Sequence, residues 1–309
     1  MNSAASKPSL FGYLALAFVC IVWGTTYLAL RIGVTQFPPL LFSLLRFLTA
    51  GPILIAILVF IGKAKFPGKE GMIHQAISGF FMITLGISIV GWAEVYISSG
   101  MAAIICSLMP VWVILINLIM NADEKPTFLI MVGLVMGFGG IVMIFGEHVS
   151  DFANSNYRLG IVMTFLGNLC WAFGSVWIKK RNTNSNPFLN AGLQMVFGGL
   201  FLIPISLVFD DYSTIHWTKE VLYSLTYLSL IGSVAGYACY SYAIKHLPMT
   251  LVSLYAYINP IVAIVLGWLV LSEKLTFRII LSMLLTVAGI YIVNKGYQLR
   301  MRWKTQVSK

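Results

Sequence analysis

Charged side chains are scarce in this sequence. Its 20 Lys and Arg and 10 Asp and Glu make up 10% of 309 residues, against roughly 25% in soluble domains. Hydrophobic residues make up 59%, and the mean hydropathy is +0.89. A soluble domain of this length needs more polar side chains to cover its surface. The composition therefore excludes a soluble enzyme and a disordered chain, and it predicts an integral membrane protein.

Clusters of metal-ligating or phosphate-binding residues are also lacking. The four cysteines are far apart, each within an apolar run, and the four histidines fall in or beside predicted connections. Neither set has the spacing of metal ligands, and no Gly-rich phosphate loop occurs. We therefore expect no metal, cofactor or nucleic acid as a partner. The basic C-terminal run fits anionic lipid headgroups better than nucleic acid.

Long apolar runs are abundant instead. Ten segments reach the ~20 residues that span a bilayer as a helix, and the connections between them are short. Their lengths and Leu/Ile/Val/Gly-rich composition favour helices over the strands of an outer-membrane barrel. The predicted fold is thus an all-α integral membrane protein of ten transmembrane helices, at residues 10–32, 40–61, 73–93, 97–120, 128–146, 158–178, 190–209, 221–243, 249–271 and 277–295.

The basic residues predict an orientation. With the N-terminus in the cytoplasm, 14 Lys and Arg fall on the cytoplasmic side and five on the other side. Cytoplasmic loops carry the excess of basic residues in membrane proteins. We therefore expect both termini in the cytoplasm.

The two halves of the chain resemble each other. Pro110 corresponds to Pro260 at an offset of 150, and Glu-Lys-x-Thr-Phe occurs at 124–128 and again at 273–277. Trp23 corresponds to Trp171 at an offset of 148. Five helices in each half force the second half to insert upside down, which predicts two inverted five-helix repeats, 1–150 and 151–309, in one membrane domain. Inverted repeats are typical of secondary transporters.

Short motifs along the whole chain resemble one family. They include Trp-Gly-Thr-Thr-Tyr at 23–27, Leu-Leu-Arg-Phe at 44–47, Ala-Glu at 93–94 with Ser-Ser-Gly at 98–100, and Asn-Pro at 259–260. In order and spacing they resemble the EamA-type branch of the drug/metabolite transporter superfamily. This resemblance implies proton- or gradient-driven movement of small organic solutes, commonly outward, across the plasma membrane, which is the inner membrane of a bacterium. It does not name the solute.

Two charged residues in or near the spans are candidates for function. An arginine at the centre of a span costs about 2.5 kcal/mol or more unless it is paired or faces water. Arg46 therefore either binds a carboxylate of the substrate, or pairs with helix-end carbonyls and holds two helices together. Glu94, near the outer end of the third span, either couples transport to protons or caps the turn that follows it.

Aromatic and polar residues share helix faces at several places. Because buried hydroxyls, indoles and amides need partners inside a bilayer, these faces should look inward. They either line a binding cavity or serve as ordinary packing, and the sequence leaves both open. The predicted substrate-binding residues are Trp23, Tyr27, Arg46, Trp171, Ser175, Tyr255 and Asn259.

Pro110 and Pro260 fall inside corresponding spans. A proline inside a helix frees a backbone carbonyl, so each is either a hinge or a tolerated kink. Gly133, Gly137 and Gly140 form a stripe that fits close helix packing within the chain or a homodimer.

These patterns together predict a secondary transporter, acting as an exporter of small organic metabolites such as amino acids or amphipathic compounds. The competing interpretation is a membrane-embedded enzyme that acts on lipid or peptide. Such chemistry needs a nucleophile and base, a metal cluster or paired carboxylates within the spans, and none is visible. No catalytic residue is therefore expected.

Overall fold

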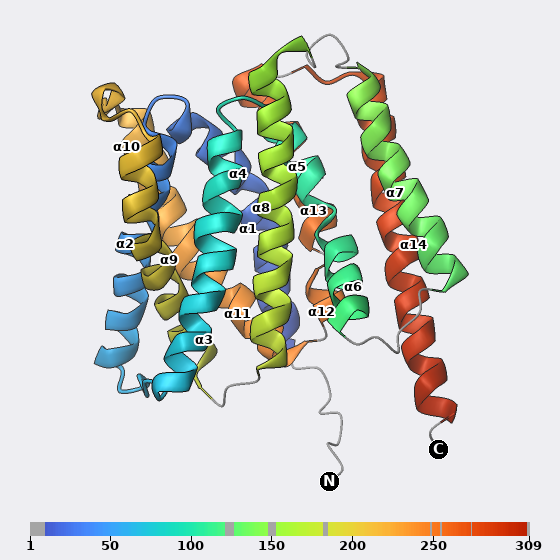
Figure 1. Cartoon of the computed structure of the whole chain (residues 1–309), viewed down its shortest axis with the longest axis horizontal. Coiled ribbons are helices and arrows are strands. Elements are labelled where there is room, and N and C mark those ends of the chain that lie inside the picture. Colours follow the sequence, from blue (N-terminus) through green and yellow to red (C-terminus); the bar gives the residue numbers. More distant parts are fainter. Residues whose placement is uncertain are drawn as a thin grey trace.

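The computed structural model describes residues 10–120, 127–147, 153–181, 185–247, 249–253, 255–272 and 274–307. Within these ranges the chain is built from helices and contains no strand. The helices run up and down in one bundle, and the start of α1 and the end of α14 lie at the same end of it (Figure 1). We call this the lower end, as it is drawn, and the opposite end the upper end.

The first half of the chain contains α1 (Leu10–Val34), α2 (Pro39–Phe60), α3 (Lys69–Gly79), η1 (Phe80–Ile87), α4 (Ser88–Ala93), α5 (Ser99–Cys106), α6 (Met109–Met120) and α7 (Phe128–Glu147). The second half contains α8 (Ser155–Lys180), α9 (Pro187–Phe209), η3 (Tyr212–Thr214), α10 (Lys219–Tyr227), η4 (Leu228–Ala235), α11 (Gly236–His246), α12 (Met249–Val252), α13 (Tyr255–Leu271) and α14 (Phe277–Val307).

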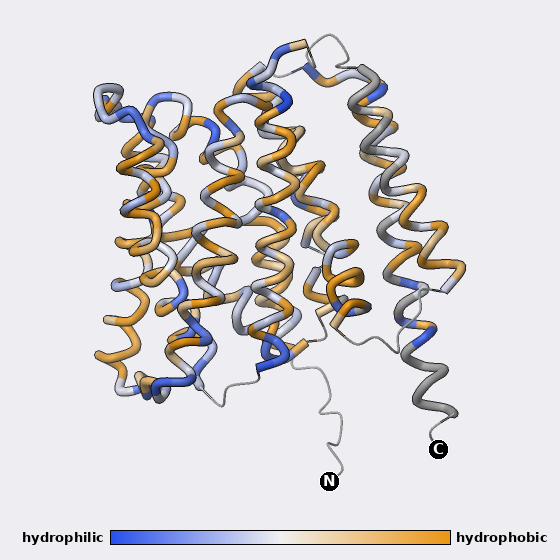
Figure 2. Tube along the Cα trace, viewed as in Figure 1, coloured by the Kyte–Doolittle hydropathy of each residue, from blue (hydrophilic) through white to orange (hydrophobic). Residues whose placement is uncertain are grey.

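Eight stretches of helix in the described residues are long and apolar enough to cross a membrane. Two shorter apolar helices, Phe128–Gly137 and Ile258–Leu271, fall within α7 and α13, where the fifth and ninth spans are predicted. Hydrophilic residues gather at the two ends of the bundle and hydrophobic ones along its middle (Figure 2). The prediction of an all-helical membrane protein is confirmed.

Two of the spans contain a π-helical turn. η1 continues α3 into α4, and η4 continues α10 into α11, so each π-helix lies in the middle of a longer helix. The two segments have the same length of eight residues and are offset by 148 residues, the offset that relates Trp23 to Trp171. π-Helices are rare and often mark functional sites. The internal similarity therefore includes an irregular feature of the backbone.

The two halves of the chain pack against each other along most of their helices. α2 lies against α9, and α7 lies along α14. α1 packs against α13, while α8 packs against α5 and α6, so the first helix of each half contacts helices late in the other half. α1 also contacts η4, and α8 contacts η1. The core is thus formed between the halves.

The glycine stripe of α7 faces α14. A Cβ atom built on Gly133 would meet the Gly289 carbonyl oxygen at 2.5 Å, and one on Gly289 would meet the Gly137 nitrogen at 2.3 Å. At Gly140 the nearest atom is the Thr286 hydroxyl oxygen, at 2.2 Å. Only glycine allows these backbones to approach so closely. The stripe serves close packing within the chain, and it offers no separate support for a homodimer.

Candidate functional site

A small cavity of about 90 Å³ lies between the two halves, and we call it the central cavity. Six of the seven residues predicted to bind substrate line it: Trp23, Tyr27, Arg46, Trp171, Tyr255 and Asn259. The remaining one, Ser175, lies one helical turn from Trp171, outside the lining of this cavity, and bonds to Tyr240. Residues from α1, α2, α8 and α13 thus meet at one place, as their inward-facing pattern predicts.

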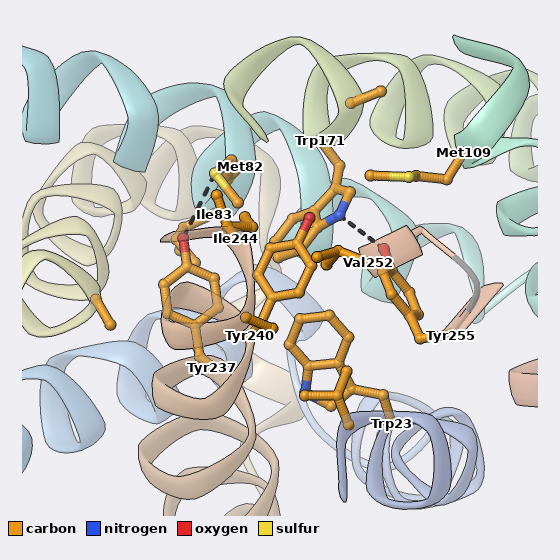
Figure 3. Close-up of a cluster of buried hydrophobic side chains, with 14 of the residues drawn as sticks. Trp23, Met82, Ile83, Met109, Trp171, Tyr237, Tyr240, Ile244, Val252 and Tyr255 are labelled. Atoms are coloured by element: carbon orange, nitrogen blue, oxygen red, sulfur yellow. Dashed lines mark hydrogen bonds between the residues drawn. The ribbon is translucent and has the colours of Figure 1, made fainter. Parts of the chain in front are cut away.

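Aromatic rings form the wall of the central cavity toward the lower end. The Trp23 ring centroid lies 5.5 Å from that of Trp171 and 5.1 Å from that of Tyr255, with near-perpendicular ring planes. Tyr240 packs against both indoles, at 4.8 Å from Trp23 and 5.3 Å from Trp171 (Figure 3). Edge-to-face contacts such as those of Trp23 with Trp171 and Tyr255 are favourable arrangements of aromatic rings. We refer to Trp23, Trp171, Tyr237, Tyr240 and Tyr255 as the aromatic cluster.

Hydrogen bonds fix the rings of the aromatic cluster. The Trp23 indole donates to the Gly232 carbonyl oxygen at 3.0 Å, within η4. The Trp171 indole donates to the Tyr255 hydroxyl at 2.9 Å (Figure 3), and the Ser175 and Tyr240 hydroxyls lie 2.9 Å apart. Because polar groups buried away from water are costly without partners, these bonds hold each ring in one orientation.

Arg46 joins helices of the two halves and also lines the central cavity. It is 4% exposed, its Nε donates to Ser233 Oγ at 2.8 Å, and its guanidinium lies 4.8 Å from the centre of the Phe47 ring. The bond to Ser233 joins α2 to η4 in the other half. The side chain also lines the central cavity, so its remaining N–H donors lie beside the space a solute would occupy.

Glu94 ends α4 close to the upper end of the bundle. Its side chain is fully buried, and Ser98 rather than Glu94 is the N-cap of α5, with its hydroxyl accepting from the Met101 N–H at 3.2 Å. The carboxyl lies near enough to interact electrostatically with Arg46, Tyr27 and Cys106, all of which line the central cavity. Glu94 therefore stands behind the cavity wall rather than in the lining.

The fourth span of the first half is broken beside the central cavity. α5 ends at Cys106 and α6 begins at Met109, so Pro110 is the second residue of a new helix, where its missing N–H costs little. The Asn168 amide donates to the Ile105 carbonyl oxygen at 3.0 Å and satisfies a group next to the break. In the second half α12 ends at Val252, and Pro260 lies inside α13. The hinge role of both prolines stays a prediction.

Further polar residues, which the sequence reasoning missed, lie below the aromatic cluster. The Tyr237 hydroxyl donates to Gln194 Oε1 at 2.6 Å, and Gln194 Nε2 donates to Gln75 Oε1 at 2.6 Å. Both glutamines are 2% exposed or less. A signal for Gln194 was present, because a polar residue inside an apolar span is itself a functional hint. It also lies 148 residues after Arg46, at the corresponding position of the second half.

The central cavity combines a cation, several hydroxyls and amides, and aromatic walls. Such a lining suits a small organic molecule that has both polar and apolar parts. At about 90 Å³ the space is well below the ~300 Å³ of typical ligand pockets. In this conformation the space is therefore too small for most organic molecules.

Several relatives of the chain are named as uncharacterized transporters. A protein of Escherichia coli (strain K12), named uncharacterized inner membrane transporter YedA, is 30% identical over 293 residues, which cover 93% of this chain and 91% of the relative. The transporter YoaV of Bacillus subtilis (strain 168) is 25% identical over 280 residues, 90% of this chain and 95% of YoaV. A transporter of Archaeoglobus fulgidus is 26% identical over 283 residues, 91% of this chain and 96% of that protein.

A solved crystal structure shares the fold. It has a TM-score of 0.67 and 17% sequence identity, and the match covers 94% of this chain and 98% of the other. The EamA-like transporter family matches the sequence twice, over residues 10–146 and 158–295. The resemblance inferred from the motifs is thus confirmed, and the chain belongs to the EamA-like transporter family.

Proposed function

We propose that the protein is a secondary transporter that binds a small organic solute in the central cavity and exposes it to the two sides of the membrane in turn. The observation that carries this proposal is the meeting of Arg46, Trp23, Trp171 and Tyr255 around one cavity between the halves. Transporters built from repeats bind their substrates near the bilayer midplane at such a boundary. Amino acids and small amphipathic compounds fit the mixed lining, and export is the proposed direction.

The proposed architecture is ten spans arranged as two inverted repeats. Three relationships at an offset of 148 residues support it: η1 with η4, the Pro39 start of α2 with the Pro187 start of α9, and Arg31 with Lys179. Arg31 donates to the Ile97 carbonyl oxygen at 2.9 Å, and Lys179 donates to the Leu247 carbonyl oxygen at 3.1 Å. Each cation thus contacts the chain just beyond the third span of its own half.

The proposed orientation places the lower end in the cytoplasm. Described basic residues at the lower end outnumber those at the upper end, as expected for the cytoplasmic side. The lower end carries Lys63, Lys65, Lys69, Lys179, Lys180, Arg181, Lys245, Lys295 and Arg300, and the upper end carries Arg31, Arg158, Lys219, Lys274 and Arg278.

Proton coupling through Glu94 is part of the proposal. The full burial of its carboxyl and its electrostatic interaction with Arg46 support this role, because a proton on Glu94 changes the net charge beside the cavity. The prolines Pro110 and Pro260 are proposed as the points about which the fourth and ninth spans bend.

A flux screen in proteoliposomes tests the function. Amino acids and small amphipathic compounds are offered with and without an imposed pH gradient, and Arg46→Ala is compared with Arg278→Ala, which removes an exposed arginine of α14. We expect at least one solute whose flux is lost with Arg46→Ala and kept with Arg278→Ala. Equal flux through both variants would remove the central cavity from the transport path.

A further inference from the structure

A second cavity opens at the lower end, and we call it the lower cavity. It has a volume of about 200 Å³ and lies where α8 and α11 end and α9 begins. Its polar lining residues are Lys179, Asn190, Gln194, Ser241 and Lys245. No carboxylate belongs to this lining among the described residues, so the cavity carries two positive charges and no negative one.

The two lysines keep hydrogen-bonding capacity in this arrangement. Lys179 Nζ donates to the carbonyl oxygens of Ile244 and Leu247, and Lys245 Nζ donates to the Ser185 carbonyl oxygen at 2.9 Å. An ammonium group has three donors, so one remains on Lys179 and two on Lys245. These partners are neutral carbonyls, so they leave the charge of each lysine in place. In the described ranges neither lysine has a carboxylate within ion-pair distance.

A buried amide forms the inner surface of the lower cavity. Gln194 is 2% exposed, yet it lines the cavity, and one of its two amide hydrogens is used by Gln75. Gln75 Nε2 is buried and lacks a hydrogen-bond partner in the part of the chain that the structure describes. Amide N–H groups therefore add to the excess of donors on this side.

The lower cavity lies one side chain away from the central cavity. Tyr237 is 1% exposed; its ring is 5.8 Å from that of Trp171, which lines the central cavity, and its hydroxyl lies 3.6 Å from Met82 Sδ (Figure 3). Met82 and Gln194 line the lower cavity. The aromatic cluster is thus the barrier between the two cavities. Arg46 lines the central cavity, and Gln194, at the corresponding position of the second half, lines the lower cavity.

We propose that the lower cavity is a second binding site, which takes the carboxylate of a free organic solute before it passes the aromatic cluster. Lys179 and Lys245 supply the charge, and Gln194 supplies a donor that fixes the position of the carboxylate. Capping of the last carbonyl groups of α11 explains the position of Lys179. It does not explain why Lys245 and Gln194 line the same cavity. The role as a step on the transport path rests on the proposed function, whereas the site itself does not.

Charged thiol reagents test the site without a known substrate. The full chain with Ser241→Cys is purified in detergent and labelled with methanethiosulfonates that carry either a sulfonate or a trimethylammonium group. The labelling rate of each reagent is divided by its rate of reaction with free 2-mercaptoethanol. Because a cleft of one charge sign concentrates counter-ions by a factor of 10 or more, we expect the sulfonate reagent to react about tenfold faster. Benzoate should slow the labelling and the uncharged benzamide should not.

Matched variants locate the effect. Lys245→Gln should reduce the preference for the sulfonate reagent, and Lys245→Gln combined with Lys179→Gln should reduce it further. Lys179→Arg keeps the charge and should keep the preference. This variant serves as the control if Lys179→Gln unfolds the end of α11. Phe66→Cys, exposed beside Lys65 at the same end, should show no protection by benzoate. The unsubstituted protein gives the background from its four native cysteines.

Three outcomes would overturn the proposal. One is a preference for the cationic reagent, and another is a sulfonate preference that persists in the double lysine variant. The third is labelling blocked by added phosphatidylglycerol with no protection by benzoate, which would assign the cavity to a lipid headgroup. The labelling experiment does not depend on transport. If labelling gives the expected result but the flux screen finds no transported solute, the transport role is rejected and the binding site is retained.

Discussion

The Arg46 guanidinium in α2 donates its Nε hydrogen to Ser233 Oγ in η4, at 2.8 Å. This bond crosses between the halves and orients a basic side chain that lines the central cavity. Ser233→Ala removes the acceptor but leaves the charge, so we expect KM for the transported solute to rise several-fold while kcat changes little. Arg46→Ala should abolish flux. Equal losses in the two variants would show that the bond, rather than the cation, is what transport requires.

Gly236 leaves room for the Trp23 indole. A Cβ atom on Gly236 would lie 2.6 Å from Trp23 Nε1, so Gly236→Ala must displace the indole from the Gly232 carbonyl. Overpacking of this kind costs about 1–3 kcal/mol, and thermal unfolding in detergent measures it. Gly139→Ala is the control, because its nearest neighbour would be 3.9 Å away. A Gly236→Ala protein as stable as Gly139→Ala would contradict the packing.

Glu94→Gln keeps the shape of a fully buried side chain and removes its titration. If Glu94 couples transport to protons, solute flux in this variant should continue down a solute gradient and lose its response to an imposed pH gradient. Glu220→Gln, which changes an exposed carboxyl in the first turn of α10, should keep that response. An unchanged response in Glu94→Gln would assign Glu94 a structural role only.

Lys65 and Lys219 lie at opposite ends of the bundle. In intact cells, an impermeant maleimide should label Lys219→Cys directly and Lys65→Cys only after the membrane is permeabilised. Labelling of both positions from the same side would contradict the odd number of spans predicted between them, and with it the ten-helix topology.

Helix positions and inward faces could be predicted from the sequence because the bilayer imposes them. A span needs about 20 apolar residues, and its buried polar groups must face other helices. Residues that share a face, such as Trp23 and Tyr27 or Tyr255 and Asn259, therefore meet at the central cavity. Ser175 follows the same helical spacing, yet it lies deeper and bonds to Tyr240, because spacing gives the face and not the depth.

The π-helical turns could not be predicted in this way. The hydropathy of Phe80–Ile87 and Leu228–Ala235 is that of any apolar helix. A π-helix depends on partners from elsewhere in the fold, such as the Trp23 indole that donates to the Gly232 carbonyl within η4. Gln75 and Gln194 were missed for a related reason, since their meeting depends on how α3 and α9 pack.

The interlocked packing of the halves has a consequence for how the chain acquires its structure. α1 finds its main partners in α11 and α13, and α8 finds its own in η1, α4 and α6, so the residues of one half lack most of their core contacts until the other half is in the membrane. A five-helix fragment would expose Arg46 without Ser233 and Asn168 without the Ile105 carbonyl. The two halves are therefore obligate folding partners, and two separately expressed fragments should become stable only when they are produced in the same cell.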